Sequence, residues 1–228
     1  MIVLALDSSG PTAGVALMQD DRLVYEATLN NGLTHSVNLM PMVEEAIEKS
    51  GFPLPDIDCY AAVAGPGSFT GVRIGVAAVK AMAQAQQKPC IGVNALEALA
   101  YGLAEEGDII CPIRDARVQQ VYGAAFSGGS RVMEDVALKL SQYVAQIDPL
   151  GQRFLFVGDG VEPSRQQLVA LLGNRARFAP PHLNMLKVGA AAAIALRDAH
   201  RAVKPEQLVP LYLRKSQAER ERQAHGHG

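Results

Sequence analysis

The sequence predicts an α/β fold of two lobes, each built on a mixed sheet flanked by helices. An antiparallel three-stranded meander opens the chain, a strand, a glycine-rich loop and a helix follow it, and a second β-rich segment begins after Gly107-Asp108. The predicted divisions are a first lobe of residues 1–107, a smaller second lobe of residues 108–213 and a charged tail of residues 214–228 that frays.

The first lobe is expected to begin with buried strands. Ile2–Leu6 is a continuous apolar run that ends at Asp7-Ser8-Ser9-Gly10, and Ala13–Met18 and Leu23–Leu29 follow, separated by a short polar turn. Apolar residues at helical spacing then predict an amphipathic helix over Val37–Ile47 that ends near Gly51. Because Pro41 removes one backbone hydrogen bond, we expect this helix to kink or to start late.

The rest of the first lobe repeats the order of strand and helix. The expected elements are a strand at Ile57–Ala64, a glycine-rich loop at Gly65–Gly71, a helix at Val72–Gln86, a short strand at Cys90–Val93 and a helix capped by Asn94 that runs to about Ala104.

The second lobe is expected to start with three strands that Gly128-Gly129 helps to connect. The predicted elements are strands at Ile109–Ile113, Val118–Phe126, Arg131–Leu138 and Phe154–Val157, and helices at Leu140–Ile147, Ser164–Leu172 and Met185–His200, the last capped by Asn184.

Composition excludes several classes of protein. Hydrophobic residues make up 49% of the 228 residues, which excludes a disordered chain. The 21 Lys and Arg residues against 23 Asp and Glu give a net charge of −2, which disfavours nucleic-acid binding by the chain alone. No apolar stretch is long enough to span a membrane or to serve as a signal sequence, so a cytoplasmic location is expected. Cys59, Cys90 and Cys111 are expected to be buried, reduced thiols.

The strongest local motif is Gly65-Pro-Gly-Ser-Phe-Thr-Gly71, which lies between a strand and a helix. Such a loop can direct backbone N–H groups at an anion, but it also suits a tight turn with close helix approach, and the spacing alone leaves both interpretations open. It lacks the Gly-Lys-Ser/Thr of a Walker A loop, the dinucleotide-binding spacing and the glycine of a nucleophile elbow. Asp7, Ser8 and Ser9, at the end of the first strand, are the other candidates for a phosphate site.

The histidines and carboxylates do not predict a metal site or an acid–base pair. His35 precedes the first amphipathic helix and is expected to be a helix-terminal or packing residue. His182 and His200 have no neighbours at ligand spacing, and His225 and His227 lie in the tail.

Several motifs taken together resemble the bacterial TsaB (YeaZ) family. They are Asp7-Ser8-Ser9, His35-Ser36, the glycine loop continued to Gly75, Asp115-Ala-Arg117 with Val121-Tyr122, and Pro210-Leu-Tyr-Leu-Arg-Lys-Ser-Gln-Ala-Glu219. The resemblance covers residues 1 to about 219. It implies the actin-like ATPase (ASKHA, RNase H-like) fold and a role in the threonylcarbamoyl modification of the adenosine next to the anticodon, in tRNAs that read codons beginning with A.

The resemblance also implies a subunit without its own catalytic site, metal or cofactor. The larger paralogue, TsaD, binds a metal through two histidines four residues apart, and the corresponding positions here are Ala95 and Leu99. Asp159, in Val157-Gly-Asp-Gly-Val161, would place negative charge near a nucleotide. The candidate nucleotide loop, expected to be vestigial, comprises Asp7, Ser8, Ser9, Gly65, Gly67 and Ser68.

Family members pair with TsaD through helices of the first lobe, which implies a partner surface here. We expect a direct heterodimer with TsaD, a larger complex that includes TsaE, contact with tRNA only through that complex, and a homodimer when the chain is alone. The predicted partner-binding residues are His35, Leu39, Met40, Val43, Ile47, Val72, Val76, Val79 and Lys80. Two other interpretations stay open: an active ATPase or small-molecule kinase, and a metallopeptidase.

Overall fold

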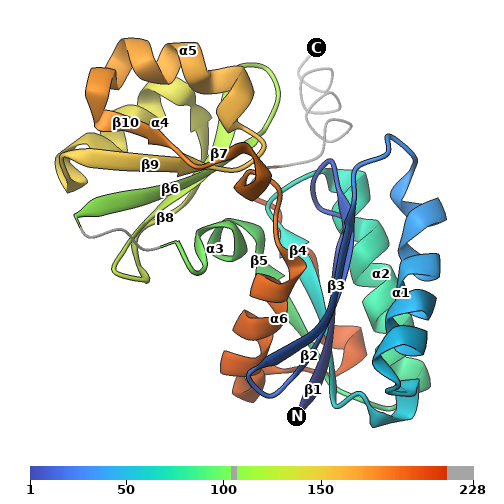
Figure 1. The fold of residues 1–228 in the computed structure, drawn as a ribbon. Coiled ribbons are helices and arrows are strands. Elements are labelled where there is room, and N and C mark those ends of the chain that lie inside the picture. The colour runs from blue at the N-terminus through green and yellow to red at the C-terminus, as the bar shows by residue number, and fades with distance from the viewer. Residues whose placement is uncertain (104–106, 215–228) are drawn as a thin grey trace, which may run out of the picture.

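A computed structural model describes residues 1–103 and 107–214 of the chain. It has two five-stranded mixed sheets, each flanked by helices, which confirms the predicted α/β class with two sheets. Figure 1 shows the first sheet in the lower half of the molecule and the second sheet above it, with α3 (Ala95–Ala100) between the two.

The first sheet has the strand order β3-β2-β1-β4-β5. Its first three strands pair antiparallel, as the meander predicted, whereas β4 and β5 run parallel to β1. Every residue of β1 after the first is buried, because helices cover both faces of this sheet. The bounds are β1 Ile2–Asp7, β2 Ala13–Gln19, β3 Arg22–Leu29, β4 Cys59–Gly65 and β5 Cys90–Asn94.

Helices α1 (His35–Ser50) and α2 (Phe69–Ala85) lie side by side on one face of the first sheet (Figure 1). They pack on alternate strand residues such as Leu4 and Leu6, while Val3 and Ala5 face the opposite side. Both helices begin earlier than predicted. Of the two effects expected from Pro41, a kink or a late start of α1, the late start is wrong, because α1 begins at His35 and contains Pro41. Helix α2 begins at Phe69 because the Ser68 side chain caps it.

The second sheet has the order β10-β9-β6-β7-β8, with α4 (Leu140–Ile147) and α5 (Val161–Leu172) packed on one face. The sequence missed β10, whose three residues pair parallel to β9. A strand this short has too few residues to show an alternating pattern. The bounds are β6 Asp108–Asp115, β7 Gln120–Ser127, β8 Ser130–Lys139, β9 Arg153–Val157 and β10 Ala176–Phe178.

Helix α6 (Val188–Arg197) is shorter than predicted and lies elsewhere in the fold. Its N-cap is Lys187, so the expected cap at Asn184 is wrong, and the Asn184 side chain instead accepts a hydrogen bond from the Gly158 N–H at 3.3 Å. The sequence placed α6 in the second lobe, but it packs on β1 and β2 of the first sheet. Together with α3, it contributes to one core that also includes residues of the second sheet.

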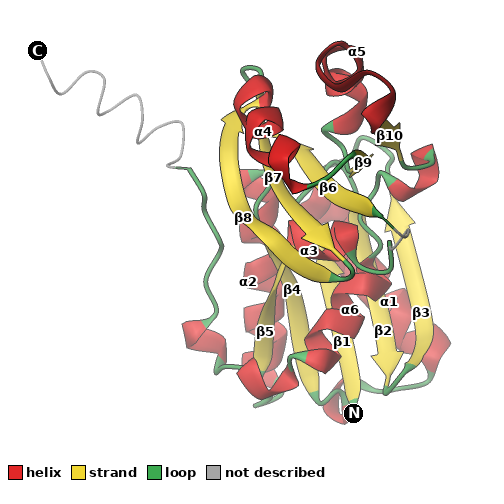
Figure 2. Ribbon diagram, turned by 90° about the vertical axis from the view of Figure 1, so that its left-hand side faces the viewer, coloured by secondary structure: helices red, strands yellow, loops and turns green. Residues whose placement is uncertain are grey.

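The last described residues form a segment that runs from the first lobe to the second, visible at the left of Figure 2. Leu211 donates its N–H to the Ala64 carbonyl at 2.7 Å, and the Tyr212 ring stacks on Phe69. Arg214 then reaches the Ala116 carbonyl of the second lobe at 2.9 Å. The predicted fraying of the tail, with His225 and His227, concerns residues that lie almost wholly outside the described part of the chain.

All three cysteines are free and buried, as predicted. Burial raises the pKa of Cys59 and Cys111 to about 12 and that of Cys90 to about 11. Because only the thiolate reacts readily, these protonated thiols are expected to resist a disulfide reagent at pH 8 in the native protein and to react after unfolding. A thiol titration in buffer and in denaturant checks this, and rapid labelling of the native protein would contradict the buried positions.

Candidate functional site

Asp7, at the end of β1, is buried, with 1% of its surface exposed. Its Oδ1 accepts hydrogen bonds from the Ser9 backbone N–H at 2.7 Å and from the Ser9 hydroxyl, while its Oδ2 has no partner. Burial raises the pKa of Asp7, against the opposing effects of the Arg114 charge, the Ser9 hydrogen bonds and the His35 charge. The candidate nucleotide loop therefore contains a buried carboxyl group, one oxygen of which has no hydrogen-bond partner.

The glycine-rich loop packs directly on the turn that follows β1. Ser68 donates its N–H to the Ser9 carbonyl at 2.8 Å, and the Ser8 hydroxyl donates to the Gly71 carbonyl at 2.8 Å. A Cβ at Gly67 would lie 2.2 Å from the Ser9 carbonyl oxygen, and one at Gly71 would lie 2.0 Å from that of Ser8. These glycines allow two backbone segments to contact each other closely. This supports the interpretation of the motif as a tight turn with close helix approach.

Arg114, near the end of β6, enters this site from the second lobe. One guanidinium nitrogen, Nη1, donates to the Ser9 hydroxyl at 2.7 Å and to the Pro66 carbonyl at 3.2 Å, and Nε lies 3.5 Å from Oδ1 of Asp159. The residue is only 3% exposed. Arg114 was not among the residues predicted from the sequence. Its position directly after the apolar run Ile109–Ile113 was a usable signal, because an arginine at the end of a buried strand needs hydrogen-bond partners.

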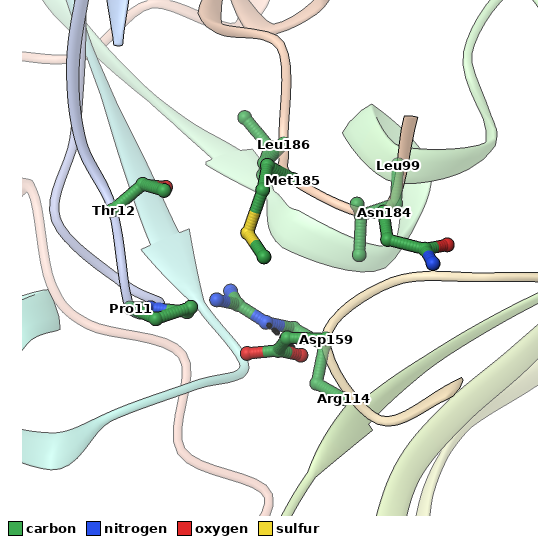
Figure 3. A pocket seen from close by; sticks show the side chains of 8 residues that line it. All are labelled: Pro11, Thr12, Leu99, Arg114, Asp159, Asn184, Met185 and Leu186. Atoms are coloured by element: carbon green, nitrogen blue, oxygen red, sulfur yellow. Dashed lines mark ion pairs between the residues drawn. The ribbon is translucent and has the colours of Figure 1, made fainter. Parts of the chain in front are cut away.

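A small hollow adjoins this ion pair, and Figure 3 shows Arg114 and Asp159 between Pro11 and the Asn184–Leu186 segment. Its enclosed volume is only about 10 Å³, which is room for about one water molecule and far too little for a nucleotide. The residues that line it are Pro11, Thr12, Leu99, Arg114, Asp159, Asn184, Met185 and Leu186.

His35 occupies the first turn of α1, as the sequence analysis expected for a helix-terminal packing residue. Its Nε2 lies 2.9 Å from the Gly10 carbonyl oxygen, and its Nδ1 is buried without a partner. The imidazole thus connects α1 to the turn after β1.

Ala95 and Leu99, which the resemblance to the family placed at the metal-binding histidine positions of TsaD, are buried in α3. Ala95 is fully buried, and Leu99 packs near Gly158 at the edge of the hollow. Within residues 1–103 and 107–214, no group of three or more His, Cys, Asp or Glu side chains is placed to hold a metal ion. No helix in the same residues is long and apolar enough to cross a membrane.

Most of the residues predicted to contact a partner belong to the core of the first lobe. Leu39, Val43, Val72, Val76 and Val79 are at most 4% exposed and pack beneath α1 and α2, so that part of the prediction is corrected. Ile47 is partly buried against the same core, and Lys80 donates to the Glu206 and Leu208 carbonyls. Met40 alone of the apolar set is well exposed, at 42%.

The outward faces of the two helices carry a different set of apolar residues, which we call the α1–α2 outer face. On α1, Val37 is 59% exposed and lies one helical turn before Met40. On α2, the exposed alanines Ala77 and Ala81 continue a line that begins at the partly exposed Ile74. The residues predicted from the sequence belong mostly to the buried face, because α1 is apolar over more than one face and the pattern does not show which face meets the sheet.

A protein-family model described as TsaD, tRNA N6-adenosine threonylcarbamoyltransferase, matches residues 32–222 of the chain. The tRNA threonylcarbamoyladenosine biosynthesis protein TsaB of Bacillus subtilis is 30% identical over 229 residues, with 96% of each chain covered. The protein of the same name from Escherichia coli is 34% identical over 128 residues, or 55% of each chain.

Among solved structures, YeaZ from Pseudomonas aeruginosa matches with a TM-score of 0.74 and 26% identity, covering 93% of this chain and 99% of that one. Component A of the (R)-2-hydroxyglutaryl-CoA dehydratase of Acidaminococcus fermentans matches with a TM-score of 0.54 and 11% identity, covering 88% of this chain and all of that one. The second match concerns the fold alone.

Proposed function

The chain belongs to the TsaB (YeaZ) family of tRNA threonylcarbamoyladenosine biosynthesis proteins, and from this premise we propose that it is a non-catalytic subunit. It pairs with a TsaD-type transferase and supports transfer of the threonylcarbamoyl group to N6 of the adenosine next to the anticodon. A larger complex also includes TsaE, and tRNA contacts the chain only within the complex.

The main support for a non-catalytic role is that the Arg114 side chain occupies the space beside Asp7. In the actin-like ATPase fold, phosphate oxygens and a hydrated Mg²⁺ would need room between the Asp7–Gly10 turn and the glycine loop. Here, the Ser9 hydroxyl and the Pro66 carbonyl contact the Arg114 guanidinium instead. Ala95 and Leu99, which have no metal-binding atoms, support the same proposal.

The α1–α2 outer face supports the pairing with TsaD. Val37 and Met40 expose large apolar side chains, and the small side chains of Ala77 and Ala81 leave room for a helix of the partner to approach closely. The two charged side chains of α2, Arg73 and Lys80, both donate hydrogen bonds within the chain, to the Tyr212 hydroxyl and to the Glu206 and Leu208 carbonyls. In the absence of TsaD, we propose that a second copy of the chain occupies the same surface.

The purified chain is expected to show no ATP hydrolysis and no threonylcarbamoyl transfer above background. Arg114 fills the phosphate space, and the sequence contains no two histidines four residues apart, the spacing expected of the metal-binding pair. Multiple-turnover hydrolysis, measured as phosphate release, checks this. Turnover that Asp7→Asn abolishes would contradict the proposal and favour an active ATPase or kinase.

The chain alone is also expected to bind tRNA weakly, because a net charge of −2 provides little attraction for the phosphate backbone. A filter-binding titration at two salt concentrations measures this. A micromolar Kd that weakens steeply with salt would show that the chain recognises tRNA without its partner.

A further inference from the structure

The groups around Arg114 form a cradle that fits a guanidinium group. We define this guanidinium cradle by Ser9, Gly10, Pro66, Gly67 and Asp159. The two hydrogen bonds from Arg114 go to oxygen acceptors, the Ser9 hydroxyl and the Pro66 carbonyl, and the Asp159 carboxylate lies beside Nε (Figure 3). A guanidinium has five N–H donors and no acceptor, so oxygen acceptors and a carboxylate are its natural partners.

Two glycines give the cradle its shape. A Cβ at Gly10 would lie 2.0 Å from Nη2 of Arg114, and a Cβ at Gly67 would lie 3.0 Å from Nη1. Because real Cβ atoms do not approach other atoms as closely as 2.0 Å, any other residue at position 10 would displace the guanidinium. Gly10 therefore accommodates the side chain of Arg114, whereas Gly67 is required first by its close approach to the Ser9 carbonyl oxygen.

The Ser9 hydroxyl also links Arg114 to the buried carboxyl of Asp7. Since Ser9 donates its hydroxyl proton to Oδ1 of Asp7, its oxygen is free to accept from Arg114. A phosphate in the same place would lie beside the Asp159 carboxylate, and like charges repel. The same carboxylate attracts a cation.

We propose that this cradle binds a guanidinium group rather than phosphate, and that Arg114 is its built-in occupant. By filling the cradle, Arg114 excludes nucleotide and attaches β6 of the second lobe to β1 and the glycine loop of the first. This cation site lies wholly within the chain, so it does not depend on the identity of the partner.

The test removes the Arg114 side chain and supplies guanidinium ions from solution. Arg114→Ala is expected to lower the melting temperature by roughly 5–10 °C, because it leaves buried acceptors without their partner. Guanidinium chloride at about tenfold excess over its Kd should restore about 3 °C of this loss, compared with equal concentrations of sodium or ammonium chloride. Magnesium-ATP should restore none.

The matched control is Arg165→Ala. Arg165 is also an arginine with an acidic partner, Glu162, but it lies on the surface of α5. Neither this variant nor the unmodified chain should gain stability from guanidinium. If Arg114→Ala shows no guanidinium-specific rise, or if magnesium-ATP stabilises it instead, the proposal is overturned.

A double-mutant cycle provides a second measurement, which uses Arg114→Lys if the alanine variant does not fold. Gly10→Ala should lower the melting temperature of the unmodified chain, because the added Cβ meets the guanidinium. The Arg114→Lys variant lacks the planar guanidinium and its five N–H donors. In this background, Gly10→Ala should lower the melting temperature by less than half as much. An equal decrease in melting temperature in the two backgrounds would show that the glycine at position 10 is not needed to accommodate Arg114. This result would contradict the guanidinium cradle.

Discussion

Replacing Met40 and Ala77 together by glutamate is expected to weaken binding of the TsaD-type partner by about 100-fold or more. Both side chains lie on the α1–α2 outer face, where a partner helix would cover them. A buried, unpaired carboxylate at each position would lose its hydration, and loss of one central anchor alone costs about 2 kcal/mol, or about thirtyfold in affinity. The fold should tolerate both changes, since neither residue is in the core.

Binding should be measured by calorimetry with TsaD from the same organism. Val169→Glu is the matched control, because Val169 is similarly exposed but lies on α5 of the second lobe. Wild-type affinity in the folded Met40→Glu, Ala77→Glu variant would mean that the partner binds elsewhere. The same variant should be monomeric in light scattering if the free chain dimerises through this face.

Gly71→Ala is expected to destabilise the chain by roughly 3–5 kcal/mol, near the upper end for a single substitution. Its Cβ would lie 2.0 Å from the Ser8 carbonyl oxygen, a backbone atom that cannot rotate away. The start of α2 would have to move, and the Ser8–Gly71 hydrogen bond would be lost with it. Urea unfolding monitored by circular dichroism measures the change.

Gly189→Ala is the control for this prediction. Position 189 is also a helical glycine, but its added Cβ would meet only the ends of two side chains, Leu23 at 3.2 Å and Glu26 at 3.5 Å. Leu23 is 47% exposed and can move aside, so the cost should be small. Equal stability of the two variants would contradict the close approach of the glycine loop to the β1 turn.

Local patterns in the sequence were sufficient to predict the strands of the first sheet and several helix ends. The run Ile2–Leu6 is buried on both faces, and the Asn94 side chain caps α3 through the Leu96 and Glu97 N–H groups, as predicted. These features depend on neighbours within a few residues of each other. The spacing of the glycine loop also predicted a tight turn, although it left a phosphate site open.

Contacts between distant residues could not be predicted in this way. Arg114 and Ser9 are 105 residues apart, so no local spacing brings them together. The core positions of α1 were misassigned for a related reason, because a helix that is apolar over more than one face does not indicate which face meets the sheet. Only the packing of α1 on the sheet places Leu39 inside and Met40 outside.

A reconstituted assay of threonylcarbamoyl transfer to tRNA tests the proposed role most directly. TsaD and TsaE from the same organism should be assayed with threonylcarbamoyl-adenylate in the presence and absence of this chain, with the Met40→Glu, Ala77→Glu variant in a parallel reaction. We expect modification only when the unaltered chain is present, and none from the chain alone. Transfer by the chain alone, or an undiminished rate without it, would contradict the role of a non-catalytic subunit.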